Sequence, residues 1–110
     1  MDAKFNLLYS DIEYSYAKQK DKEYVYTTFK NLFIFSYSKN LLKLNLVDEF
    51  GNFDKERMLT NDDFTELGLK IFEELMFKWL TYTGNDDGKI DRINNIKMLE
   101  KYYNKLTKEK

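Results

Sequence analysis

The side chains that could do chemistry in this chain are almost entirely carboxylates. The 110 residues contain no histidine and no cysteine, which removes the usual general base, the thiolate nucleophile and the commonest zinc ligands. Adjacent acids occur at 62–63, 73–74 and 86–87, but consecutive helical residues point about 100° apart and cannot converge on one substrate bond. Glycine-rich phosphate loops and serine-nucleophile motifs are also missing. The sequence therefore predicts a protein that is not an enzyme, has no catalytic residues and needs no cofactor.

A stretch of twelve residues that begins at Thr83 and ends at Asn94 is similar to the calcium-binding loop of EF-hand proteins. In this comparison Asn85, Asp87 and Asp91 take the third, fifth and ninth positions and would offer oxygen ligands. The family has Asp at the first position and a bidentate Glu at the last, where this chain has Thr83 and Asn94. Loss of two anionic ligands weakens any such site. An ordinary polar turn between two helices is therefore the favoured interpretation, and no metal is expected.

The acidic residues are concentrated in one part of the chain. Residues 48–91 contain twelve acids and five bases, whereas the whole chain has a net charge of only −1. Such a block is either a solvated face or a surface that attracts a basic protein by electrostatic steering. The nine tyrosines suit the second interpretation, because tyrosine anchors many protein contacts. That interpretation assigns partner binding to seven acids around a predicted loop and helix start: Asp48, Glu49, Asp54, Glu56, Asp62, Asp63 and Glu66.

The C-terminal half combines a helical pattern with a few polar positions in the runs Met58-Leu59-Thr60, Phe64, Leu67-Gly68, Ile71-Phe72, Trp79-Leu80 and 98–103. This combination resembles the small helical immunity proteins of contact-dependent growth inhibition and related bacterial polymorphic toxin systems. The resemblance implies a cytoplasmic, non-enzymatic protein that binds one toxin domain, often a nuclease, and covers its active site. A nuclease carries Lys and Arg where phosphates bind, so an acidic surface would complement it.

Two other functions stay open. A phage-encoded inhibitor of a host nuclease or defence complex would have the same acidic, tyrosine-rich character. The order of a leucine-rich segment at 41–47, a turn at Gly51 and a helix containing Gly68 is also similar to part of a bacterial winged-helix DNA-binding regulator. Duplex DNA requires a basic patch, and the acidic block 48–91 would repel it. No nucleic acid partner is therefore expected.

No segment of the chain is expected to enter a membrane. The longest apolar run, residues 32–35, is far shorter than the roughly 20 residues of a transmembrane helix. The start of the chain has polar residues where a signal peptide has an apolar core. The cytoplasm is therefore the expected location.

Apolar spacings of three and four residues predict the helices that would position these groups. Helices are expected at about 3–19, 61–82 and 91–106. Residues 22–47 fit one long helix, which we favour, but their β-branched, aromatic and alternating stretches also allow a hairpin and an α+β fold. The expected fold is an all-α bundle of about four helices that forms a single domain over residues 1–110.

Local signals predict how the helix at 61–82 begins, ends and packs. Thr60 followed by Asp63 is a typical helix-start signature, and Gly84 is a suitable C-terminal stop. Gly68 inside the helix costs about 1 kcal/mol relative to alanine. Its presence there predicts a close approach by another helix on that face.

Overall fold

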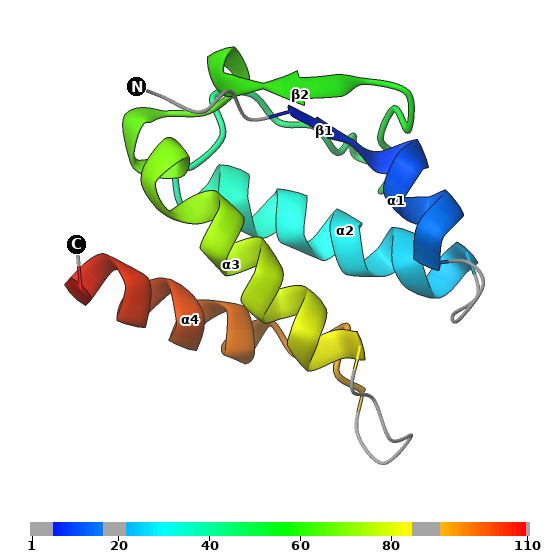
Figure 1. Ribbon diagram of the computed structural model, residues 1–110. Coiled ribbons are helices and arrows are strands. Elements are labelled where there is room, and N and C mark those ends of the chain that lie inside the picture. Colours follow the sequence, from blue (N-terminus) through cyan, green and yellow to red (C-terminus); the bar gives the residue numbers. More distant parts are fainter. Residues whose placement is uncertain (1–5, 17–21, 85–90, 110) are drawn as a thin grey trace.

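Two helices, α2 (Lys22–Ser38) and α3 (Glu66–Gly84), form the centre of the protein and contribute the largest share of its buried side chains (Figure 1). The computed structural model describes residues 6–16, 22–84 and 91–109. The other elements within these ranges are α1 (Tyr9–Tyr16), α4 (Ile96–Glu109), the short 3-10 helix η1 (Asn61–Asp63), β1 (Asn6–Leu8) and β2 (Met58–Thr60). A mainly helical domain with four helices is confirmed for the described residues, and a small antiparallel sheet accompanies it.

The contact between α2 and α3 is organised around Trp79. Its side chain is fully buried, and its indole N–H donates a 2.9 Å hydrogen bond to the carbonyl of Thr28 in α2. A buried indole donor without a partner is costly, so this bond makes Trp79 compatible with an apolar environment. The helical spacing turns one apolar face of each helix inward: Val25, Phe29, Leu32 and Phe33 from α2, with Ile71, Phe72 and Leu75 from α3.

Helix α4 lies against α3 and α2 along its apolar side (Figure 1). Leu99 and Leu106 are buried in this contact. Lys39, just after α2, forms a 3.0 Å ion pair with Glu100 of α4. Apolar and charged residues lie on opposite sides of α4, so its apolar side packs in the core and its lysines lie in solvent.

The helix predicted at 3–19 is confirmed over Tyr9–Tyr16 and wrong over Asn6–Leu8, and its ends at 3–5 and 17–19 lie outside the described residues. Residues Asn6–Leu8 instead form β1, which pairs antiparallel with β2 in the register Leu7↔Leu59. Leu7 and Leu59 are buried while their neighbours are more exposed, which is the alternation of a strand. The local apolar spacing is compatible with a helix, but pairing with a strand far along the chain decides the outcome.

The other two predicted helices begin later in the structure than the sequence indicates. Helix α3 begins at Glu66, because residues 61–63 form η1. Thr60 and Asp63 make the predicted capping contact, with the Thr60 N–H donating to Asp63 Oδ2 at 2.9 Å, but they cap η1 rather than α3. Helix α4 begins at Ile96 after a turn and continues past its predicted end.

The C-terminal end of α2 is a capping motif centred on Asn40. Asn40 has a φ of 62°, and its N–H donates to the carbonyl of Tyr37 at 3.0 Å. The N–H of Leu41 donates to the carbonyl of Ser36 at 2.8 Å. This is the Schellman arrangement, in which a left-handed residue closes a helix, and asparagine tolerates that conformation better than most residues. The helix favoured for residues 22–47 is therefore confirmed only over α2, and the small sheet forms elsewhere, between β1 and β2.

Leu41, directly after this cap, lies against the start of α3. Its carbonyl oxygen accepts the N–H of Thr65 at 3.0 Å, and Thr65 Oγ1 in turn caps α3 by accepting the Gly68 N–H at 3.0 Å. A Cβ at Gly68 would lie 2.0 Å from the Leu41 oxygen, far inside van der Waals contact. The predicted close approach at Gly68 is confirmed, but the segment after α2 makes it rather than another helix.

Replacing Gly68 with alanine is expected to lower the free energy of unfolding by about 2–4 kcal/mol, because the added Cβ forces the Leu41 carbonyl away from α3. Gly84 is the matched control, since it ends the same helix and a Cβ there meets nothing within 4 Å. Gly84→Ala should change stability by less than about 0.5 kcal/mol. Urea denaturation measures both variants, and equal stabilities would contradict the close backbone contact.

Candidate protein-binding site

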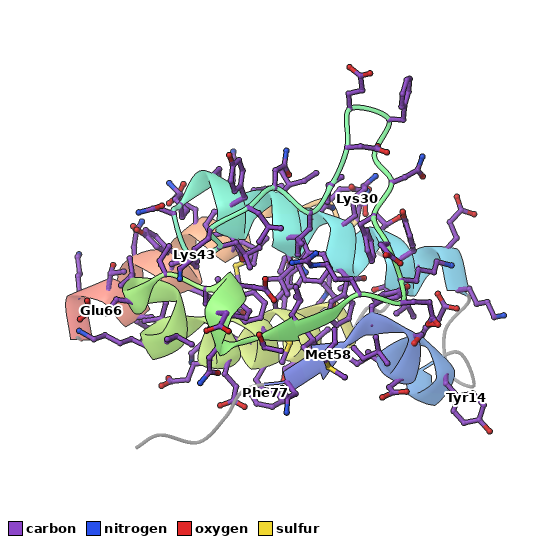
Figure 2. The ribbon with its side chains drawn as sticks, turned by 90° about the horizontal axis from the view of Figure 1, so that it is seen from above. Tyr14, Lys30, Lys43, Met58, Glu66 and Phe77 are labelled. Carbon is purple, nitrogen blue, oxygen red and sulfur yellow. The ribbon has the colours of Figure 1, made fainter. Side chains whose placement is uncertain are left out.

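Residues 48–57 form a loop that projects from the side of the molecule between α2 and β2 (Figure 2). The Asp48 carboxylate accepts hydrogen bonds from the N–H groups of Phe50 and Asn52, both at 2.9 Å. The Asp48 N–H donates to the Asn52 carbonyl, and the Gly51 N–H donates to the Asp48 carbonyl. Gly51 has a φ of 83°, a conformation that favours glycine. The tip of the 48–57 loop is therefore shaped by its own hydrogen bonds.

An aromatic cluster, which we call the aromatic clamp, holds the base of the loop against α2: Tyr9, Tyr26, Phe33 and Phe53. Phe53 stacks on Tyr26 with 4.4 Å between ring centroids, and its N–H donates to the Tyr26 hydroxyl at 2.9 Å. Tyr9 and Phe33 meet the Phe53 ring edge-on at 5.0 and 5.2 Å. Such ring pairs contribute about 0.5–1.5 kcal/mol each beyond burial. The aromatic clamp therefore fixes one end of the loop while its tip faces solvent.

Phe50 stands at the tip and is 80% exposed, the highest value among the large apolar side chains of the described residues. Burial of a phenylalanine side chain stabilises a folded protein by about 1.5–3 kcal/mol. The exposed ring of Phe50 does not contribute this stabilisation in the free protein. The backbone around Phe50 is hydrogen-bonded, so the ring stands on an ordered turn. Exposed aromatic rings on ordered loops are common anchors in protein interfaces.

Phe50 is not among the site residues that the sequence predicts, although a signal for it was present. Asp48 and Gly51 are spaced as the first and fourth residues of a common β-turn, which places Phe50 at a corner of that turn. Whether a phenylalanine at such a corner turns into the core or into water depends on what packs beneath it. Here Phe53, rather than Phe50, occupies the apolar position against α2.

Three of the seven predicted acids form hydrogen bonds or ion pairs with other groups of the loop and its neighbours. Asp48 shapes the loop tip, as described above. Asp54 Oδ1 accepts the N–H of Glu56 at 2.9 Å. Asp63 forms a 2.8 Å ion pair with Arg57 and also caps η1. These three carboxylates contribute first to the local structure, and the charge of Asp63 is largely compensated by Arg57.

The other four predicted acids are exposed and fall into two groups: Glu49 and Glu56 in the 48–57 loop, and Asp62 and Glu66 near the start of α3. Glu66 also lies 3.9 Å from Lys70 Nζ, one turn along the same helix. Figure 2 shows Glu66 at an end of the molecule, away from the projecting loop. The structure therefore places Glu49 and Glu56 in the same loop as Phe50, and it does not gather all seven acids into one surface.

A partly buried ion pair ties the loop to α1. Lys55 Nζ lies 3.1 Å from Glu13 Oε2 and 5.2 Å from the centre of the Tyr26 ring. Burial disfavours the charged form of Glu13, but the Lys55 ammonium and the Tyr9 hydroxyl beside it favour that form more strongly, so the pKa of Glu13 is lowered. Burial, together with the neighbouring Glu13 carboxylate, raises the pKa of Tyr9, whose phenol therefore stays protonated.

Two residues of the possible calcium loop, Asn85 and Asp87, lie outside the described residues. The third, Asp91, is exposed and accepts a 2.9 Å hydrogen bond from the side chain of Asn94. Among residues 6–16, 22–84 and 91–109, no three acidic side chains are grouped so that they could hold a metal ion.

A small cavity beneath the loop is lined mainly by apolar side chains, among them Leu7, Tyr9, Phe33, Phe53 and Leu59. Its volume of about 40 Å³ has room for a few water molecules and not for an ordinary metabolite. The chemistry that the loop can perform is therefore surface contact, through an aromatic ring and exposed carboxylates.

No protein family, curated protein or solved structure matches this chain. In the part of the chain that the structure describes, no helix is both long and apolar enough to cross a lipid bilayer. The interpretation of the site therefore rests on its own geometry.

Glu13→Gln is expected to lower the melting temperature at neutral pH, by an amount that decreases as the pH falls below 4.5. The pKa of Glu13 is lower in the folded protein than its ordinary value of 4.5, so its charge stabilises the fold above that value. This stabilisation is lost as the pH falls through the folded pKa. Thermal unfolding from acid to neutral pH measures the difference. Glu73→Gln, at an exposed position on α3, should show no such dependence, and a pH-independent effect of Glu13→Gln would contradict the ion pair.

Proposed function

We propose that this protein is a non-enzymatic inhibitor of the immunity type, which binds a protein toxin domain and blocks it. The observation that carries the proposal is Phe50, an exposed aromatic ring on a hydrogen-bonded loop beside Glu49. A nuclease domain is the favoured partner, because its phosphate-binding cleft presents Lys and Arg side chains. The ring would enter an apolar recess of that cleft, and the loop carboxylates would pair with the basic groups around it.

Preorganisation of the loop supports this function. Ordering a loop on binding costs free energy, and here the Asp48 carboxylate and the aromatic clamp order it before any partner arrives. A central aromatic residue commonly accounts for about 2 kcal/mol or more of binding free energy. The exposed carboxylates of Glu49 and Glu56 add long-range attraction, which raises the association rate for a basic partner.

Phe50→Ser is expected to abolish capture of the partner from the source cells while leaving the fold intact, because the ring is already in solvent. Leu69→Ser is the matched control, since it removes another exposed apolar side chain, from α3, and should still capture the partner. Affinity capture with quantitative mass spectrometry compares the variants. The purified partner should bind Phe50→Ser about 30-fold more weakly, through faster dissociation. Equal capture by both variants would reject Phe50 as the anchor.

The captured partner also tests the inhibitor assignment. Expression of that partner should be toxic to cells, and co-expression of the wild-type protein, but not of Phe50→Ser, should suppress the toxicity. A partner with no toxic activity would overturn the immunity function even where the loop contact holds.

Reversing the charge of Glu49 with lysine should slow association with the purified partner about tenfold at low salt, with little change in dissociation. Glu73→Lys reverses an exposed charge on α3 and serves as the control. Stopped-flow measurements at several ionic strengths give both rates and their salt dependence. An association rate for Glu49→Lys that equals the wild-type rate at every ionic strength would exclude electrostatic steering by the loop.

A further inference from the structure

A row of lysines runs along the outer side of α4. Four exposed lysines follow one another at intervals of four, four and three residues: Lys97, Lys101, Lys105 and Lys108. Intervals of three and four place side chains on one side of a helix, with about 6 Å of rise for every four residues. This separation is comparable to that of successive phosphates along an extended nucleic acid strand. The lysine row lies opposite Leu99 and Leu106, which hold α4 in the core.

An aromatic groove of about 400 Å³ adjoins the lysine row, between α3 and α4, and is lined by Phe77, Lys78, Thr81 and Tyr102. Phe77 is 57% exposed, and Figure 2 shows it at the edge of the molecule. Lys78 Nζ lies 5.9 Å from the centre of the Tyr102 ring. Tyr102 and Lys105 are three residues apart on α4 and therefore neighbours on its surface. The aromatic groove and the lysine row are thus continuous.

The four lysines outnumber the two acids of α4, Glu100 and Glu109. Glu100 of α4 is turned toward α2, where it pairs with Lys39 at 3.0 Å. Glu73 and Glu74 lie four residues before Phe77 and Lys78 on α3, so they border the groove on its α3 side. The anionic groups of a bound polyanion would therefore lie along α4, and its less polar parts would lie in the groove on the α3 side.

We propose that this surface binds single-stranded nucleic acid, with phosphates along the lysine row and a base stacked in the aromatic groove against Phe77 and Tyr102. Stacking requires an unpaired base, which a duplex does not offer. Membrane binding through α4 would need a free apolar side, and α4 uses that side in the core. The expectation of no nucleic acid partner rested on the acidic block 48–91; the lysine row of α4 lies outside this block, and the groove residues of α3 lie within it. The proposal is independent of the 48–57 loop and of the inhibitor function.

Fluorescence anisotropy with a labelled oligothymidylate of about 12 nucleotides, a length that a small single-strand-binding domain covers, tests the proposal. The wild type should bind with an affinity that falls as salt rises. Lys101→Glu/Lys105→Glu should bind about tenfold more weakly or worse, with a shallower salt slope, because each lost phosphate contact removes about 0.7 from that slope. Phe77→Ala should weaken binding about fivefold at an unchanged slope, because it removes stacking and no charge.

The control Lys43→Glu/Lys70→Glu makes the same change in net charge at two exposed lysines outside α4 and should bind like the wild type. Circular dichroism checks that each variant folds. The proposal would be overturned by no binding of the wild type at low salt, by equal weakening in the control pair, or by equal affinity for a duplex of the same length. Binding to anionic phosphatidylglycerol vesicles without binding to the oligonucleotide would also overturn it, in favour of a membrane surface.

Discussion

The contact between the Leu41 carbonyl and the backbone of Gly68 is the constraint on which the rest of the structure depends. It joins the cap that ends α2 to the cap that begins α3, because the same carbonyl accepts the N–H of Thr65. With no side chain between the two backbones, α2 and α3 converge at this end, and Trp79 can bond to Thr28 farther along. The chain after Leu41 then returns along α2 to β2 (Figure 1).

That return path explains why the 48–57 loop is ordered although it projects into solvent. The aromatic clamp fixes Phe53 against α2, while Asp48 closes the tip with its own carboxylate. In each of the two surfaces proposed for binding, charged side chains lie beside an exposed aromatic ring. Phe50 accompanies acids in the loop, whereas Phe77 accompanies lysines beside α4. Charge acts over distance, and a ring contributes once contact is made.

The elements differ in how well the sequence predicts them, because local patterns report burial of one helix face but not pairing with a distant segment. Helices α3 and α4 follow from apolar residues at three- and four-residue spacing, because that periodicity reports burial of one helix face. Residues 6–8 show a compatible spacing but form β1, since β2 supplies a partner that local patterns do not report. The end of α2 depends on Asn40 in a left-handed conformation, and asparagine signals such a cap more weakly than glycine does.

The sequence by itself determined the chemistry that is present and the faces of the helices. Carboxylates and phenols without imidazole or thiol, an acidic block at 48–91 and the lysine spacing on α4 can all be read from it. Only the tertiary structure decided that Asp63 is compensated by Arg57, that Glu66 lies away from the loop and that Phe50 faces water. Periodicity and charge are properties of neighbouring residues, whereas pairing and exposure depend on which distant segments the fold brings into contact.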